Sequence, residues 1–249
     1  MRIARFSDGT NPVYGALEER SKRIVGLKGD PLFSPVEPSG QIYELDEVRL
    51  LSKVVGIGNN YSDTPIPADE RPEPPIFLKA NTSVIGPDDP IAIPAWSDDV
   101  AFEGELAIVI KSLAKDVSAS DASQVILGYT VANDVTARDA MTGGPWARGK
   151  SFDTSCPLGP WVTVDPTLDV TNLAIRSYLN GEKAQDSSTA HMIWNPFELV
   201  SYVSHQMTLL PGDVIVTGAP AGCGRVDAGD RVEIEIEEIG SLMNPVVRA

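Results

Sequence analysis

Residues 98–110 have the sequence DDVAFEGELAIVI, in which Glu103 and Glu105 stand one residue apart inside an apolar run typical of a buried strand. Side chains alternate between the two faces of a strand, so both carboxylates are expected on the face that carries Ala107 and Val109. The opposite face is entirely apolar. Two like charges on one face need compensation, either from water or from a cation between them. Taken alone, the stretch leaves both alternatives open, and a solvated strand face is the commoner of the two.

The composition predicts a globular protein rich in strands. The chain has 249 residues, of which 42% are hydrophobic and 22% charged, so it can bury a large core. Only 6% of the residues are aromatic, and 20 prolines and 21 glycines indicate many turns. These features disfavour an all-helical bundle. We predict an α+β fold that is predominantly β.

The charge balance excludes several classes of partner. The formal net charge is −15 and the sequence has no basic run, so it disfavours nucleic-acid binding. The start MRIARFSDGT lacks an apolar signal segment, and no run approaches the roughly 18 apolar residues that span a bilayer, so we expect a cytoplasmic protein without a membrane partner. The only cysteines, Cys156 and Cys223, are expected to be free, and two histidines, His191 and His205, offer little to a zinc site.

Turn and breaker signals divide the chain. Short apolar runs separated by polar turns predict a small strand-rich N-terminal subdomain over residues 1–48, followed by a main domain over residues 49–249. The prolines of residues 62–75, SDTPIPADERPEPP, predict a surface loop.

The remaining elements follow from periodicity. Residues 118–139 are expected to form a helix that leads into a strand, and residues 195–207, NPFELVSYVSHQM, have the apolar spacing of a second helix. Asn180-Gly181 predicts a tight hairpin between two strands.

Asp134 adds a third carboxylate to the pair on residues 98–110. It follows the apolar run ILGYTVAN and therefore emerges at the end of a strand. Three carboxylates without a His or Cys cluster suit Mg²⁺, Mn²⁺ or Ca²⁺ better than zinc.

Two further segments each have a structural and a functional interpretation. In residues 146–161, WARGKSFDTSCPLGPW, Lys150 is either a solvated surface charge or a cation aimed at an anionic ligand. Residues 217–224, TGAPAGCG, fit neither common nucleotide-binding glycine motif. They form either a turn before the final strands or a loop whose backbone N–H groups approach a ligand oxyanion. Cys156 is expected to be a structural thiol, and both histidines are expected to be structural or surface residues.

Together these segments resemble the fumarylacetoacetate hydrolase family. The resemblance covers about residues 53–247 and rests on segments that occur in the family's order: VVGIGNNY, PIFLKANTSVIGPDDPI, FEGELAIVI, GYTVANDVTARD, WARGKSFDTSCPLGPW, NGEKAQDSSTAHMI, MTLLPGDVIVTGAPAGCG and GSLMNPV. It implies a mixed β-sheet roll, a homodimer or higher oligomer, one Mg²⁺ or Mn²⁺ per site, and a substrate that is a small 2-oxo or diketo acid.

The resemblance also implies roles for individual residues. Glu103, Glu105 and Asp134 are the implied metal ligands. Lys150 is expected to contact the substrate and stabilise a developing enolate, with Asp153 nearby. Substrate contacts are implied for Tyr61, Thr189, Thr217 and Gly218. Arg138 is expected either to bind substrate or to form a salt bridge with Asp139.

One departure from the family's pattern bears on the reaction. Hydrolases of the family carry a His shortly after the Asn-Tyr pair, and a Glu one turn later, which together activate water. Thr64 stands at the position of that His in a proline-rich segment, and only Asp63, Asp69 or Glu70 offer a replacement base. We therefore predict decarboxylation or keto–enol isomerisation, as in the 2-hydroxyhepta-2,4-diene-1,7-dioate isomerase and oxaloacetate decarboxylase branches. The alternatives are C–C hydrolysis of an acylpyruvate or fumarylpyruvate, and a metal-binding paralogue without turnover.

Overall fold

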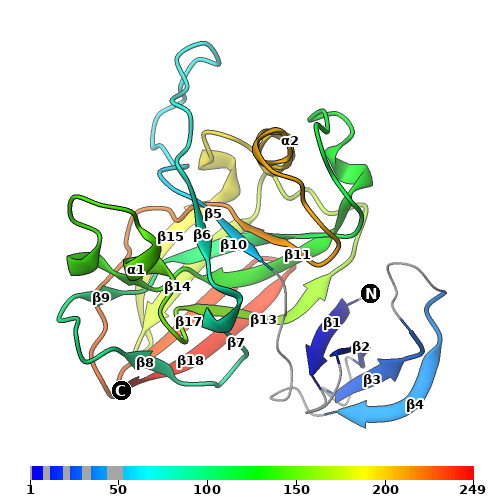
Figure 1. The fold of residues 1–249 in the computed structure, drawn as a ribbon, viewed down its shortest axis with the longest axis horizontal. Coiled ribbons are helices and arrows are strands. Elements are labelled where there is room, and N and C mark those ends of the chain that lie inside the picture. Colours follow the sequence, from blue (N-terminus) through cyan, green and yellow to red (C-terminus); the bar gives the residue numbers. More distant parts are fainter. Residues whose placement is uncertain (1, 8–11, 19–22, 30–34, 44–52) are drawn as a thin grey trace.

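Strands dominate the protein and curl into a mixed sheet, as predicted (Figure 1). The computed structural model describes residues 2–7, 12–18, 23–29, 35–43 and 53–249. The predicted boundary between residues 48 and 49 lies outside the described residues. Among these residues no helix has the length and apolarity that crossing a membrane requires.

The largest sheet has eleven strands within the described part of the chain, with β10 and β11 near its middle. Its order is β4-β3-β2-β1-β13-β11-β10-β16-β5-β6, and β7 pairs with β13 off this path. The strands are β1 (Arg2–Ser7), β2 (Pro12–Glu18), β3 (Arg23–Leu27), β4 (Pro38–Tyr43), β5 (Val54–Ile57), β6 (Ile76–Lys79), β7 (Val84–Ile85), β10 (Gly104–Ile110), β11 (Ile126–Asn133), β13 (Cys156–Thr163) and β16 (Val214–Val216).

The N-terminal strands extend this sheet. β1 pairs antiparallel with β13, with Ile3 opposite Val162, and β2, β3 and β4 follow in order (Figure 1). The predicted strand-rich start is therefore joined to the main sheet by backbone hydrogen bonds.

A second sheet packs against the first and buries the main core. It has the order β15-β14-β17-β18-β8, formed by β8 (Ile91–Ile93), β14 (Ala174–Leu179), β15 (Glu182–Ser188), β17 (Arg231–Ile236) and β18 (Gly240–Arg248). Leu106 and Ile108 of the first sheet share one apolar cluster with Ile175 and Ile234 of the second. β9 (Val100–Ala101) pairs with β12 (Thr136–Ala137) beside this core. The predicted hairpin is confirmed, because Asn180 and Gly181 turn between β14 and β15 with φ of 55° and 86°.

One of the two predicted helices is present. α2 (Pro196–Gln206) is capped at its N-terminus by Asn195, whose side chain accepts hydrogen bonds from the backbone N–H groups of Phe197 and Glu198. The helix expected within residues 118–139 was wrong: only a 3-10 turn over Ala122–Gln124 precedes β11. The Oγ of Ser118 accepts from the N–H of Asp121 as an N-cap would, but the chain completes only this short turn before Ile126 pairs with Ile110 of β10.

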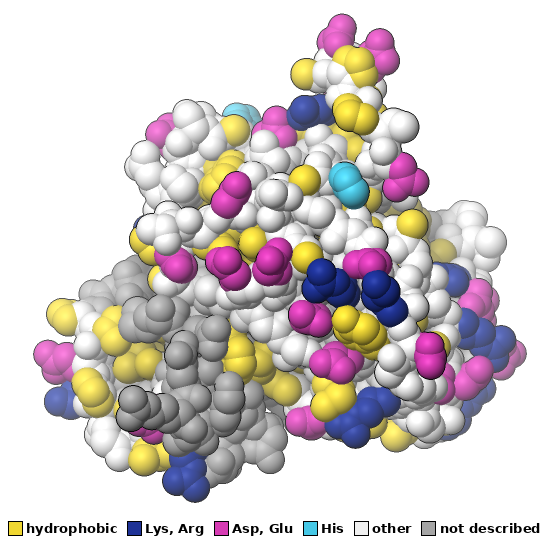
Figure 2. Space-filling view, turned by 180° about the vertical axis from the view of Figure 1, so that it is seen from behind, with side chains coloured by type: hydrophobic (Ala, Val, Ile, Leu, Met, Phe, Trp, Pro, Cys, Tyr) yellow, Lys and Arg dark blue, Asp and Glu magenta, His cyan; other side chains and the backbone are white. Residues whose placement is uncertain are grey.

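The proline-rich segment of residues 62–75 is a surface loop between β5 and β6, as predicted, and it projects from the body (Figure 1). Its first residues lie against the segment before α2, where the Ser62 N–H donates to the carbonyl of His191 at 3.0 Å. Later in the loop, Arg71 forms an ion pair of 3.0 Å with Glu198 of α2. The projection carries exposed acidic side chains (Figure 2). Asp69 and Glu70 of this loop are exposed.

Candidate metal and substrate site

Neighbouring ends of β10 and β11 bring three carboxylates together. The strands are antiparallel, with Glu105 opposite Ala132, and the Asp134 N–H donates to the carbonyl of Glu103 at 2.8 Å. One oxygen from each of Glu103, Glu105 and Asp134 lies within 4.8 Å of the others. Glu105 and Asp134 are only 1% exposed, whereas Glu103 is partly open to solvent.

Burial and neighbouring negative charge disfavour the ionised forms of Glu103 and Glu105 in this cluster. Burial and then the charge of Asp134 raise the pKa of Glu105 well above its usual range, and the same two causes raise the pKa of Glu103. No ion pair to Glu105 is present within the described part of the chain; Glu105 accepts a hydrogen bond from the Gly218 N–H at 2.7 Å. An all-oxygen set of three carboxylates fits a hard divalent ion such as Mg²⁺ or Mn²⁺.

Lys150 lies at the edge of the carboxylate cluster. It ends the short helix α1 (Ala147–Lys150), and its Nζ is 2.5 Å from Oδ2 of Asp134 and 2.8 Å from Oε2 of Glu103. The same Nζ lies 4.8 Å from the centre of the Phe77 ring. Burial alone would lower the pKa of Lys150, but the Asp134 and Glu103 carboxylates outweigh it and raise the pKa above its usual value. Lys150 is therefore a charged hydrogen-bond donor.

Two residues of the site were missed by reasoning from the sequence. Lys79, at the end of β6, is buried and its Nζ lies 2.5 Å from Oδ1 of Asp134. The buried Asn60 donates through its side chain to the carbonyls of Thr217 and Trp194, at 2.8 and 3.0 Å, and accepts from the Trp194 N–H at 2.8 Å. The only available signal for Lys79 was a lysine closing the apolar run PIFLK. Asn60 belongs to the Asn-Tyr motif, which by itself does not indicate these hydrogen bonds.

The carboxylate cluster opens into a cavity of about 270 Å³. The charged residues Glu103, Glu105, Asp134 and Lys150 line it together with a mainly apolar set, Ile57, Phe77, Met141, Trp146, Ala219 and Cys223. Burial and then the charge of Glu103 raise the pKa of Cys223 to about 12, so its thiol is protonated near neutral pH. With a divalent cation held by the carboxylates, the cavity would suit a small anion with an apolar portion.

Tyr61 and Arg138 lie near this cavity. The Tyr61 hydroxyl is buried and has no hydrogen-bond partner among the described residues, and its burial and then the charge of Glu105 raise the pKa of Tyr61 above its usual value. Arg138 is exposed and donates to the carbonyl of Cys223 at 3.3 Å. The alternative salt bridge from Arg138 to Asp139 is absent from the described residues; Asp139 instead accepts from Ser97 and from the Asp98 N–H.

The other residues expected near the substrate either form hydrogen bonds within the protein or lie outside the cavity lining. The Thr217 hydroxyl and N–H both donate to the carbonyl of Leu106, and the Gly218 N–H is taken by Glu105, so this loop holds β10. Thr189 is buried, and its hydroxyl oxygen accepts from the Leu173 N–H. Asp153 is exposed. Thr189 and Asp153 are not among the residues lining the cavity above the carboxylates.

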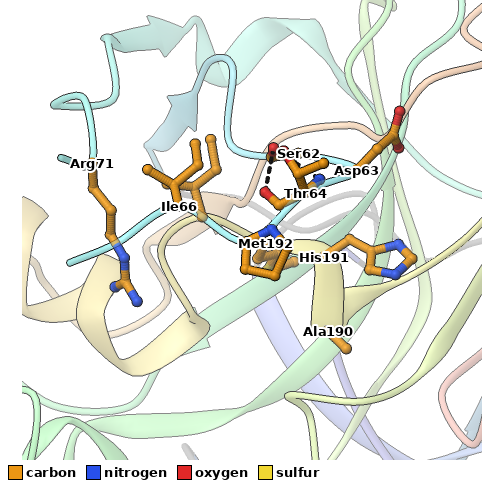
Figure 3. A pocket seen from close by; sticks show the side chains of 10 residues that line it. Ser62, Asp63, Thr64, Ile66, Arg71, Ala190, His191 and Met192 are labelled. Carbon is orange, nitrogen blue, oxygen red and sulfur yellow. Dashed lines mark hydrogen bonds between the residues drawn. The ribbon is translucent and has the colours of Figure 1, made fainter.

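Thr64 lines a separate cavity of about 330 Å³ beneath the projecting loop (Figure 3). Asp63 and Thr64 come from the loop, and His191 comes from the segment that faces it. The Ser62 hydroxyl donates to the carbonyl of Thr64 at 2.7 Å. The His191 ring lies 3.2 Å from the Ser187 hydroxyl, and it is not hydrogen-bonded to Asp63 within the residues described. The loop thus has no preformed histidine–carboxylate pair.

A cluster of three carboxylates at strand ends, beside a charged lysine and among apolar residues, suits metal-assisted chemistry on a small ligand. The chain belongs to the fumarylacetoacetate hydrolase family, as predicted: residues 53–247 match the fumarylacetoacetate (FAA) hydrolase C-terminal domain. Residues 1–52 match the Rv2993c-like N-terminal domain.

Relatives within the family include isomerases, tautomerases and hydrolases. The chain is 42% identical over 230 residues to the human mitochondrial oxaloacetate tautomerase FAHD2B, covering 86% of this chain and 72% of that protein. It is 43% identical to the structure of 5-carboxymethyl-2-hydroxymuconate delta-isomerase from Mycobacterium smegmatis, with a TM-score of 0.89 and full coverage of both chains. Fumarylpyruvate hydrolase from Pseudomonas aeruginosa, solved with Mn²⁺ and pyruvate, is 31% identical with a TM-score of 0.74, over 82% of this chain and 93% of that one. These likenesses support an enzyme of this family.

Proposed function

We propose that the protein is an enzyme that acts on a small 2-oxo carboxylic acid by decarboxylation or keto–enol isomerisation, with Mg²⁺ or Mn²⁺ as cofactor. The observation that carries this proposal is the cluster of Glu103, Glu105 and Asp134, whose oxygens lie within 4.8 Å of one another beside the ammonium of Lys150. The tautomerase and isomerase relatives support the reaction type.

The three carboxylates would hold the metal ion. When bound, such an ion polarises the carbonyl of a 2-oxo acid and stabilises negative charge on its oxygen. Two of the three N–H bonds of Lys150 are directed at Asp134 and Glu103, and the third would donate a charge-assisted hydrogen bond to the same oxygen. Its raised pKa makes it a donor in this step, not a base.

Tyr61 is our candidate for moving the proton. Its buried hydroxyl lacks a hydrogen-bond partner among the described residues, and its raised pKa keeps the proton on Oη at neutral pH. In decarboxylation, the carboxylate would leave as CO₂, the electron pair of the broken bond would move to the enolate oxygen, and Tyr61 would then add its proton to carbon. In isomerisation of an enol to the keto acid, Tyr61 would add its proton to carbon, and the proton released from the enol oxygen would restore that of Tyr61. Arg138, at the Cys223 side of the cavity, is proposed to bind a second anionic group of the substrate.

Hydrolysis of an acylpyruvate or fumarylpyruvate is the second candidate, supported by the likeness to the Pseudomonas aeruginosa hydrolase. It needs a base that activates water, and the loop carries Thr64 where the family's histidine is expected. A metal-binding paralogue without turnover is the third alternative. We also propose a homodimer, which light scattering after gel filtration will test.

The test is a panel assay with Mg²⁺ or Mn²⁺ and three substrates: oxaloacetate, an acylpyruvate and a 2-hydroxydienedioate. Loss of CO₂ or a change in the enol absorbance, abolished in Glu105→Ala, supports the proposal. Cleavage of the acylpyruvate alone would replace it by hydrolysis. Tight metal binding without turnover of any substrate would favour the paralogue.

A further inference from the structure

We infer that Lys79 is a positioning residue of this site: it fixes the orientation of Asp134 and supplies the positive charge that lets the metal-loaded site attract a substrate carboxylate. This inference rests on the proposed metal site. The Lys79 side chain is completely buried, with its Nζ 2.5 Å from Oδ1 of Asp134 and 3.3 Å from the carbonyl of Val135. An enclosed ammonium needs such a partner to keep its charge.

Asp134 is held between two ammonium groups that come from different elements. Lys79 of β6 binds Oδ1, and Lys150 of α1 binds Oδ2 at 2.5 Å. Rotation of the carboxylate away from this orientation would break both bonds, and all three side chains are at most 5% exposed. The plane of Asp134 is therefore fixed before any ion binds, which is the usual task of groups that surround a metal ligand.

Strand β6 carries this arrangement on one face. Phe77 and Lys79 are two residues apart and both are buried, whereas Leu78 between them is 49% exposed. The Phe77 ring lies 4.8 Å from the Lys150 ammonium, and the Lys79 ammonium contacts Asp134. One short strand at the edge of the sheet thus contacts both the lysine and the aspartate of the candidate site.

Charge counting gives Lys79 a role beyond holding Asp134. With all three carboxylates ionised, Lys79 and Lys150 leave the cluster with one negative charge. A divalent ion changes this to one positive charge, which favours an anion. Without Lys79 the loaded site would be neutral, and the attraction for a carboxylate would fall. A purely structural ion pair would not affect anion binding in this way.

Lys79→Met removes the charge and keeps a side chain of similar length. The probes are Mn²⁺ alone and then oxalate added to the Mn²⁺-saturated protein, each followed by calorimetry. We expect oxalate to bind at least about tenfold more weakly to Lys79→Met, with affinity regained in Lys79→Arg. Unchanged oxalate affinity in Lys79→Met would overturn the inference. If the wild type binds neither Mn²⁺ nor oxalate, the proposed function itself fails.

Lys53→Met is the matched control. Lys53 also pairs with a buried aspartate, Asp213, but neither residue lines the cavity above the carboxylates. This variant should lose thermal stability without a change in oxalate affinity. The wild-type protein provides a test that does not depend on folding of the variants. In a crystal structure with Mn²⁺ and oxalate, Lys79 should stay hydrogen-bonded to Asp134, and a broken pair would contradict the inference.

Discussion

The backbone N–H of Gly218 donates a hydrogen bond of 2.7 Å to Oε2 of Glu105. Through this bond the loop after β16 holds a carboxylate that lies on β10, more than one hundred residues earlier in the chain. Gly218 has a φ of +95°, a conformation that side chains other than glycine rarely adopt. The conformation of this glycine and the placement of Glu105 are therefore coupled.

Gly218→Ala should destabilise the protein and weaken metal binding together. A Cβ at this position would lie 2.8 Å from Cβ of Asn60, and the positive φ adds strain, so we expect a loss of about 1–3 kcal/mol in the free energy of unfolding. Urea unfolding and Mn²⁺ titration will measure both effects. Gly144→Ala is the control, because its Cβ would have no heavy atom within 4 Å. Equal unfolding midpoints for the two variants would contradict the coupling.

Glu105→Gln should abolish tight metal binding while the protein stays folded. The change removes one of three negative ligands. Loss of a residue that only hydrogen-bonds to a metal ligand lowers metal affinity by about 10–100-fold, so we expect loss of a ligand itself to lower Mn²⁺ affinity by at least about 100-fold. The metal-free protein should unfold at the same or a higher urea concentration, because a buried like charge is lost.

Glu233→Gln is a control from within the chain. Glu233 and Glu235 repeat the Glu-x-Glu spacing on β17, where both are half-buried and contact Ser241 and Arg176. Calorimetry should show unchanged Mn²⁺ affinity in this variant. Retention of tight binding by Glu105→Gln would show that the ion, if bound, is held elsewhere.

These two Glu-x-Glu pairs show what local sequence can and cannot predict. Alternation in a strand places the two side chains of each pair on one face, whatever lies opposite. Only the third carboxylate, Asp134 on the neighbouring strand, distinguishes Glu103 and Glu105 from Glu233 and Glu235. The predominance of strands, the hairpin at Asn180-Gly181 and helix α2 were likewise predictable, because their signals lie within a few residues.

Features that depend on long-range contacts were not predictable. Lys79 and Asp134 are 55 positions apart, and nothing near Lys79 in the sequence indicates that its ammonium is buried. The same applies to the bond between the Asn60 side chain and the carbonyl of Thr217, 157 positions away. The predicted helix after Ser118 failed for the same kind of reason, because the residues that follow the turn at Ala122–Gln124 pair as β11 with β10 and β13.

Trp146→Ala should change substrate preference more than anion binding. Trp146 lines the same cavity as the carboxylates and packs edge-on against Phe77, with 5.6 Å between ring centres. We expect kcat/KM for a 2-oxo acid with an apolar tail to fall about tenfold or more, as for the loss of one hydrophobic contact to the substrate. Oxalate has no tail, so its affinity should change less than about threefold by the same argument.

Trp96→Ala is the control for this change. Trp96 is a half-exposed tryptophan outside the cavity lining, where it packs edge-on against Phe152. Steady-state kinetics with a series of 2-oxo acids of increasing tail length should leave Trp96→Ala close to the wild type. An equal loss for oxalate and for tailed acids in Trp146→Ala would assign Trp146 to folding of the site.

Thr64→His should not create hydrolysis of acylpyruvates. Thr64 is exposed on a loop without helix, next to Pro65 and close to Pro67, so a histidine there would have no positioned carboxylate partner to orient it. We expect acylpyruvate cleavage to stay within about threefold of the wild-type rate, since base catalysis contributes only when the base is held in reach of its proton. Thr64→Ala should behave in the same way. Rapid acylpyruvate cleavage by the unmodified protein would instead show that another group, such as Asp63 or His191 beside the same cavity, already activates water.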